Sequence, residues 1–175
     1  MIVKTPWATL NAEVSEMDHF PDLLRVQYDL ARDSRGELLK FCGRLALEEF
    51  VLENSAFGRG SVRNLLTHIG NTYLYWIGEV CLGRDMTYAE YNSIPDLMGI
   101  LRHFDLVDRV MGSFLAESGD LGLREATFQL NGSPGKASFL KIFTHTLSHE
   151  FHHKGQILSL CRHLGYIPVD TDIMR

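Results

Sequence analysis

The chain has 175 residues, of which 45 % are hydrophobic and 22 % charged, a composition typical of a globular protein with room for one sizeable core. Its net charge of −5 disfavours a dedicated nucleic-acid-binding protein, and no apolar run reaches the roughly 20 residues of a membrane span. The N-terminus lacks a secretory signal pattern, and Cys42, Cys81 and Cys161 are too widely spaced for a disulfide framework, so we expect free thiols and a cytoplasmic protein.

The first half of the chain predicts two long helices. The first begins near Pro21, a favourable first-turn residue, and its apolar spacing continues to Phe50. Residues 54–61, NSAFGRGS, have the composition of a loop. Ser61 is a suitable N-cap for the second helix, and Gly83 is a suitable stop.

The second half predicts two more helices. Residues 95–96, Pro-Asp, open the third helix, and Ser138 caps the last one, which runs to about Leu164. Between them, residues 124–138 combine weak strand character with an NGSPG turn, which indicates a long crossover with a hairpin-like element. Four helices of this length predict an all-α four-helix bundle with a long crossover before the last helix, in one domain over residues 1–175.

Half of the eight histidines lie in the predicted last helix, namely His145, His149, His152 and His153. A helical wheel places His153 inside the apolar arc and His149 at its border, whereas His145 and His152 lie farther from the core. Residues at i and i+4 stand about 5–6 Å apart, so two imidazoles at that spacing can bind one divalent metal ion. A third ligand must come from another helix: the inward-facing His68 is the first candidate, and His103 is the rival.

Other side chains near this cluster admit two interpretations. An i, i+4 histidine pair alone is more often a pair of surface polar residues than a metal site. Tyr73, Tyr75 and Trp76 could line a pocket, but we expect Tyr73 and Trp76 to be core aromatics. Gln156 falls near His149 on the wheel, where it either holds a histidine by a hydrogen bond or faces solvent. The remaining histidines, His19 and His163, are interpreted as structural.

Residues 149–153, HEFHH, also match the H-E-x-x-H pattern, in which two histidines bind zinc and the glutamate serves as general base. The extended form of the pattern fails, because Gln156 stands in place of its glycine and no histidine follows at the required distance. Glu150 is interpreted instead as an i+4 partner of Lys154. A protease-like metallohydrolase is therefore the least favoured interpretation.

Three segments together resemble the DinB/YfiT-like superfamily of metal-dependent four-helix proteins, over about residues 20–172. They are LLRVQYDLARDSRGELL, GSVRNLLTHIG and HTLSHEFHHKGQILSLCRHLG. The resemblance implies a metal-binding triad of His68, His149 and His153, the same three residues that the helical spacing selects. Lys154 stands where arginine is commoner, and lysine lacks the guanidinium fork.

The resemblance also implies zinc or nickel as the metal, a homodimer, and, in some members, transferase or isomerase activity with a low-molecular-weight thiol. Three neutral imidazoles leave one position of a divalent ion open, as in catalytic zinc sites. The leading hypothesis is therefore a metal-dependent enzyme with a small-molecule substrate, such as a thiol S-transferase or a related hydrolase. A non-catalytic metal-binding or stress-response dimer is the alternative. A third hypothesis is a metal-free dimeric interaction module, since the last helix has a wide apolar arc.

Overall fold

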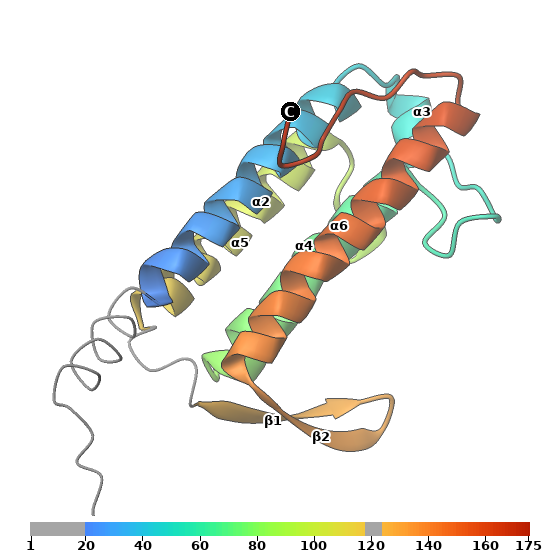
Figure 1. The fold of residues 1–175 in the computed structure, drawn as a ribbon. Helices are drawn as coiled ribbons and strands as arrows, with labels where there is room; N and C mark the ends of the chain where they lie inside the picture. The colour runs from blue at the N-terminus through green and yellow to red at the C-terminus, as the bar shows by residue number, and fades with distance from the viewer. Residues whose placement is uncertain (1–19, 118–123) are drawn as a thin grey trace, which may run out of the picture.

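The computed structural model describes residues 20–117 and 124–175, which form a mainly helical structure with one small β-hairpin (Figure 1). The expected all-α class is corrected by this hairpin, which lies in the segment where the sequence indicated one. His19 and part of the expected crossover lie outside the described residues. In chain order the elements are α2 (Phe20–Cys42), α3 (Leu47–Val51), α4 (Val62–Tyr73), the π-helix η1 (Leu74–Cys81), the 3₁₀-helix η2 (Tyr91–Ser93), α5 (Leu97–Ala116), β1 (Glu125–Leu130), β2 (Ser133–Ser138) and α6 (Phe139–His163).

The predicted starts of α4, α5 and α6 and the predicted glycine stops are confirmed. The side chains of Ser61, Asp96 and Ser138 each accept a hydrogen bond from the backbone N–H three residues further on, which caps α4, α5 and α6. Gly83 follows η1 with φ of 65°, and Gly165 follows α6 with φ of 90°. These left-handed conformations suit glycine, which has no Cβ, and they end the helices where the sequence indicated.

The expected single helix from Pro21 to Phe50 is wrong, because the chain turns after Cys42. The N–H groups of Arg44 and Leu45 donate to carbonyls three residues back, which tightens the last turn of α2 and ends it. The chain is extended at Ala46 before the short helix α3 begins. This turn lets α3 bury the ring of Phe50, which is 2 % exposed, in the core.

The long helices pack in neighbouring pairs around one shared core. Helix α4 contacts both α5 and α6, and α2 also contacts α5 and α6. Figure 1 shows α2 beside α5, α4 beside α6, and the hairpin at the end of the molecule where α6 begins. The largest fully buried core side chains are Tyr73, Phe41, Phe114, Phe143, Leu24, Leu38, Leu65, Leu66, Ile69, Leu74, Ile77 and Ile100. None of the helices within the described residues has the length and apolar character needed to cross a bilayer.

The helix expected from Ser61 to Gly83 changes type halfway. From Leu74 onward it is a π-helix, and the N–H of Leu82 donates to the carbonyl oxygen of Ile77, five residues back, at 3.0 Å. The wider turn alters the angular phase of the side chains that follow α4. Such π-segments recur at functional sites because they redirect side chains, and here the segment carries Tyr75 and Trp76.

The hairpin closes through a two-residue turn. Strands β1 and β2 pair antiparallel, and Asn131 and Gly132 between them have φ of 51° and 77°. Two consecutive positive φ angles are the requirement of a type I′ turn, which explains the Asn-Gly pair. The Tyr75 hydroxyl donates to the carbonyl oxygen of Gln129 at 2.7 Å, so the hairpin is held against η1.

Candidate metal centre and adjoining cavity

The structure brings His68, His149 and His153 together. His68 comes from α4, and the other two lie one turn apart on α6. The Nε2 atom of His149 lies 3.0 Å from Nε2 of His68 and 3.1 Å from Nε2 of His153. Candidate ligand atoms of the three residues all lie within 4.8 Å of one another. The three side chains are therefore positioned to bind one metal ion.

Gln156 fixes the orientation of His153. The Oε1 atom of Gln156 lies 2.7 Å from Nδ1 of His153, so this nitrogen donates and Nε2 keeps its lone pair toward the cluster. The amide nitrogen of Gln156 lies 3.2 Å from Nε2 of His152, which holds the amide in this orientation. Of the two interpretations of Gln156, the hydrogen-bonded one is confirmed. Such a bond to the outer nitrogen is common for metal-binding histidines.

The electrostatic environment keeps the cluster uncharged. Burial, together with the nearby Arg59 guanidinium, lowers the pKa of His68 to about 3. Burial also lowers the pKa of His149 to about 4, with help from His153 and His145. The pKa of His153 is lowered by burial as well, although the bond to Gln156 opposes this effect. At neutral pH the imidazoles are neutral, the form that binds metals.

The spacing of the three nitrogens fits a divalent transition metal. Zinc–nitrogen bonds near 2.0–2.1 Å in a tetrahedral site place two nitrogen ligands about 3.3 Å apart. The observed separations of 3.0 and 3.1 Å are close to this value. An all-imidazole donor set suits zinc, nickel, copper or iron rather than magnesium or calcium.

His103, the rival third ligand, does not join this cluster. Its ring lies buried between α5 and α4, where a Cβ atom on Gly70 would come within 2.3 Å of His103 Cδ2. Burial lowers its pKa, and its Nε2 atom has no hydrogen-bond partner among the described residues. His103 therefore fills a helix–helix contact that depends on the missing side chain of Gly70.

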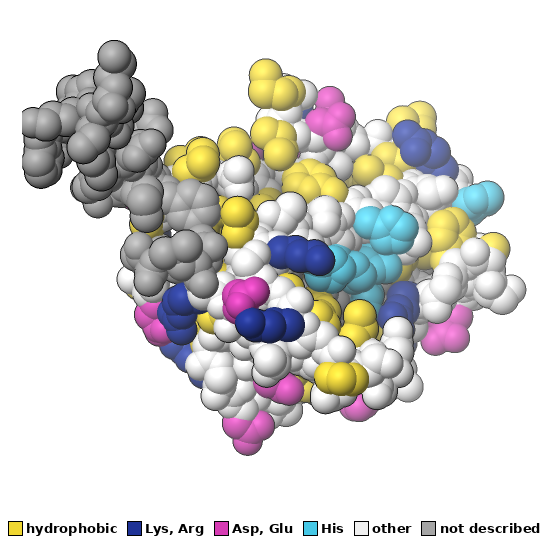
Figure 2. All heavy atoms as spheres, turned by 60° about the horizontal axis from the view of Figure 1, so that its bottom comes forward, with side chains coloured by type: hydrophobic (Ala, Val, Ile, Leu, Met, Phe, Trp, Pro, Cys, Tyr) yellow, Lys and Arg dark blue, Asp and Glu magenta, His cyan; other side chains and the backbone are white. Residues whose placement is uncertain are grey.

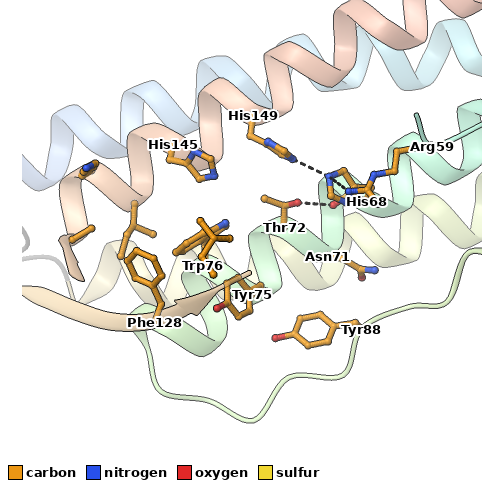
Figure 3. Close-up of a pocket in the computed structure, with 14 residues that line it drawn as sticks. Arg59, His68, Asn71, Thr72, Tyr75, Trp76, Tyr88, Phe128, His145 and His149 are labelled. Carbon is orange, nitrogen blue, oxygen red and sulfur yellow. Dashed lines mark hydrogen bonds between the residues drawn. The ribbon is translucent and has the colours of Figure 1, made fainter. Parts of the chain in front are cut away.

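A cavity of about 700 Å³ adjoins the histidine cluster. His68 and His149 stand at one end of it, and His145 also faces it (Figure 3). Figure 2 shows histidine side chains gathered on one face of the molecule, with Lys or Arg side chains on either side. The lining residues are Arg59, His68, Asn71, Thr72, Tyr75, Trp76, Tyr88, Phe128, Leu130, Ala137, Lys141, Ile142, His145 and His149. A cavity of this size and lining suits a small organic molecule.

Aromatic rings line one part of the cavity wall. The ring of Trp76 meets those of Phe128, Tyr75 and His145 edge-on, with centroids 4.8, 5.0 and 5.3 Å apart. Tyr73 is a core aromatic, as expected, whereas Trp76 is buried and also lines the cavity.

The segment after η1 supplies another part of the wall. The side-chain amide of Asn71 donates to the carbonyl oxygen of Ala89 at 2.8 Å and accepts from the Ala89 N–H at 3.0 Å. This double hydrogen bond ties the extended segment to α4. It thereby places Tyr88, whose hydroxyl donates to Glu79, at the cavity.

The opposite face of α6 carries a buried ion pair. Glu150 accepts from Arg35 Nε at 3.0 Å, from a second Arg35 nitrogen at 3.3 Å and from the Tyr73 hydroxyl at 2.5 Å. Arg35 also donates to Asp108 at 2.9 Å. Burial opposes the charge of Arg35, but Glu150 raises its pKa well above the usual value. With its carboxylate held in this network, Glu150 is not placed to act as the base of an H-E-x-x-H site.

The expected pairing of Glu150 with Lys154 is wrong. The buried Lys154 ammonium donates to the hydroxyl of Ser34 and, at 3.1 Å, to the carbonyl oxygen of Thr171. Burial lowers its pKa to about 8. Lys154 therefore fastens the C-terminal segment to α2 and α6, a role for which a point-like ammonium suffices.

Sequence reasoning missed two groups of residues. The first group comes from loops and the hairpin, where no helical periodicity predicts which way a side chain points. It consists of Arg59, Tyr88 and Phe128. Arg35 was detectable, because it continues the inward stripe of α2 that contains Tyr28 at i−7. A charged residue on an inward stripe indicates a buried partner on another helix.

The chain was also compared with known proteins. The model of a family described as the DinB family matches residues 21–175. A search of curated proteins found no match. The matched region includes all the described helices except the first residue of α2, together with the three clustered histidines. The chain therefore belongs to the DinB family.

Proposed function

We propose that the chain is a metal-dependent enzyme that acts on a small molecule bound in the cavity. His68, His149 and His153 are the proposed ligands, and zinc or nickel is the proposed metal. The observation that carries the proposal is the convergence of three neutral imidazoles, two of which line a largely apolar cavity. A structural zinc site, by contrast, almost always has four protein ligands.

We further propose transfer of a low-molecular-weight thiol to an electrophilic substrate, with hydrolysis as the related reaction. A bound divalent ion supplies Lewis acidity, which lowers the pKa of a thiol or water. His145 lies beside the cavity, with its ring centroid 5.5 Å from that of His149, and is the proposed proton acceptor. In the transfer, the thiol proton passes to His145, the sulfur bonds to the electrophilic carbon, and the leaving group departs with the bonding electron pair. Gln156 holds His153 in the orientation that this site requires.

Three further properties of the chain are proposals. The four long helical segments make up a four-helix bundle, supported by their pairwise packing. A homodimer is supported by exposed apolar side chains at i, i+3 and i+7 of α2, namely Leu23, Val26 and Leu30. A cytoplasmic location is supported by three free, buried cysteines. Analytical sedimentation tests the homodimer. A strict monomer at micromolar concentration would refute this part of the proposal.

Elemental analysis tests the metal site. Tag-free wild-type protein should contain about one zinc or nickel ion per chain, and His68→Ala and His149→Ala should lose it. His163→Ala is the matched control, because His163 is exposed on the same helix and lies outside the cluster. Thiol consumption with a panel of electrophiles should then occur only in the metal-loaded protein. Absence of metal from the wild type after incubation with zinc and nickel would refute the proposal.

A further inference from the structure

The charged side chains in the cavity wall are all basic. Among the described lining residues, Arg59 and Lys141 are cationic and none is Asp or Glu. The whole chain, by contrast, has 22 acidic and 17 basic residues. A positively charged cavity in an acidic protein favours an anionic ligand.

Neither of these two cations is neutralised by a carboxylate among residues 20–117 and 124–175. Arg59 lies 3.3 Å from the Tyr91 hydroxyl and 3.5 Å from His68 Nε2, both uncharged partners. Lys136, on the adjoining strand β2, instead pairs with Glu125. Lys141 is exposed in the first turn of α6, so its ammonium is available to an acidic group of a ligand.

Much of the rest of the wall is apolar and aromatic. Trp76 and Phe128 meet edge-on, and Leu130 and Ile142 extend the apolar surface. Aromatic walls favour a ligand with a flat apolar body, because rings stack or meet edge-on with a further favourable contribution. A small polar ion would leave this apolar surface uncovered.

One cation and two of the cavity histidines follow one another along α6. Lys141, His145 and His149 are spaced at i, i+4 and i+8, so they lie on one side of the helix over about 12 Å. Lys141 and His149 both line the cavity, and they stand at the two ends of this stretch of α6. A ligand that touches both ends must therefore be elongated.

We infer that the substrate is an elongated organic anion with a flat apolar body. Its acidic group pairs with Lys141, its body lies against Trp76 and Phe128, and its reactive end reaches His68 and His149. The position of the reactive end rests on the proposed metal-dependent function. Binding of the anion itself needs no metal, because every group that recognises it belongs to the chain.

Calorimetric titration with 2-naphthoate and its neutral analogue 2-naphthylmethanol tests this inference. Full-length protein is titrated as purified and after removal of metal by a chelator. In both forms, 2-naphthoate should bind at least about 10-fold more tightly than the alcohol, since hydrogen bonds and ion pairs to a charged group are the stronger kind. Equal affinity for the two compounds, or tighter binding of the alcohol, would overturn the inference.

Three variants locate the binding. Lys141→Met should weaken 2-naphthoate about 10-fold and leave the alcohol unchanged, whereas Lys136→Met, the matched control, should change neither. Phe128→Ala should weaken both compounds alike, because the body loses a wall. An unchanged affinity of 2-naphthoate for Lys141→Met would overturn the assignment. If anion binding persists in a protein that takes up no metal, the proposed function fails while this inference stands. If the protein takes up metal but does not prefer the anion, this inference fails while the proposed function stands.

Discussion

Replacing Glu150 by glutamine should strongly destabilise the fold. The carboxylate accepts three hydrogen bonds, two from Arg35 and one from Tyr73. A glutamine of the same shape has one acceptor oxygen, and its NH₂ group would face a donor. The side chains of Arg35 and Glu150 are only 3 % and 1 % exposed, so solvent cannot compensate for the lost partner.

The magnitude follows from the burial of this pair. Removing one partner of a buried ion pair typically lowers the free energy of unfolding by about 3–5 kcal/mol, because a charge is left uncompensated. For a chain of this length, that loss corresponds to a melting temperature roughly 6–20 °C lower. Arg35 keeps its bond to Asp108, which favours the lower half of the range.

The assay is urea-induced unfolding followed by circular dichroism. Glu117→Gln is the matched control: Glu117 is 51 % exposed and 3.6 Å from Arg84, so its variant should stay within about 1 kcal/mol of wild type. Metal content, measured in parallel, should be unchanged in folded Glu150→Gln. A variant as stable as wild type that had lost only turnover would refute the structural role and favour an H-E-x-x-H base.

Three further outcomes are expected. Gln156→Leu should weaken metal affinity about 10–100-fold in a competition titration with a chromophoric chelator, because His153 loses the bond that orients it; an unchanged affinity would show that the bond has no such role. Gly70→Ala should lower the unfolding free energy by about 1–3 kcal/mol, because a new Cβ would overlap the His103 ring. Gly112→Ala, with open space around it, should raise the unfolding free energy by about 0.5–1 kcal/mol. Equal effects of the two substitutions in thermal unfolding would contradict the packing argument. Burial raises the pKa of the Cys42 thiol well above its ordinary value of 9.0, so the unfolded chain releases this proton first and stability is lost as pH rises above 9. Between pH 8 and pH 10, the fall in unfolding free energy should therefore be about 1 kcal/mol smaller in Cys42→Ala than in wild type, and identical pH dependence would show that the thiol does not titrate differently on folding.

Local sequence rules located most helix ends and the three clustered histidines. Ser61, Asp96 and Ser138 are capping residues whose effect depends only on the next three residues. The convergence of His68 with His149 and His153 followed from helical periodicity, because the inward faces of neighbouring helices meet in the core. These features are short-range, or repeat regularly, and so are visible in a single sequence.

The remaining features depend on contacts between distant segments. Glu150 falls within the apolar arc of α6, but its partner Arg35 lies 115 residues away, and an i+4 lysine offered a nearer alternative. The cavity wall needs the hairpin, the segment around Tyr88 and the π-helix to meet, and no periodicity predicts their relative placement. The turn after Cys42 was missed because apolar residues continue at helical spacing beyond it.

The hairpin is a part of the cavity wall that can be altered separately from the histidine cluster. It supplies Phe128, Leu130 and Ala137 to the cavity, whereas the histidines stand on α4 and α6. Its turn at Asn131 and Gly132 is exposed and contributes no residue to the cluster. Changes in strand length or side chains there would reshape the cavity while the clustered histidines keep their spacing. In evolutionary terms, a segment of about fourteen residues is enough to change which molecules fit the cavity, because loops and hairpins tolerate variation that helices of the core do not.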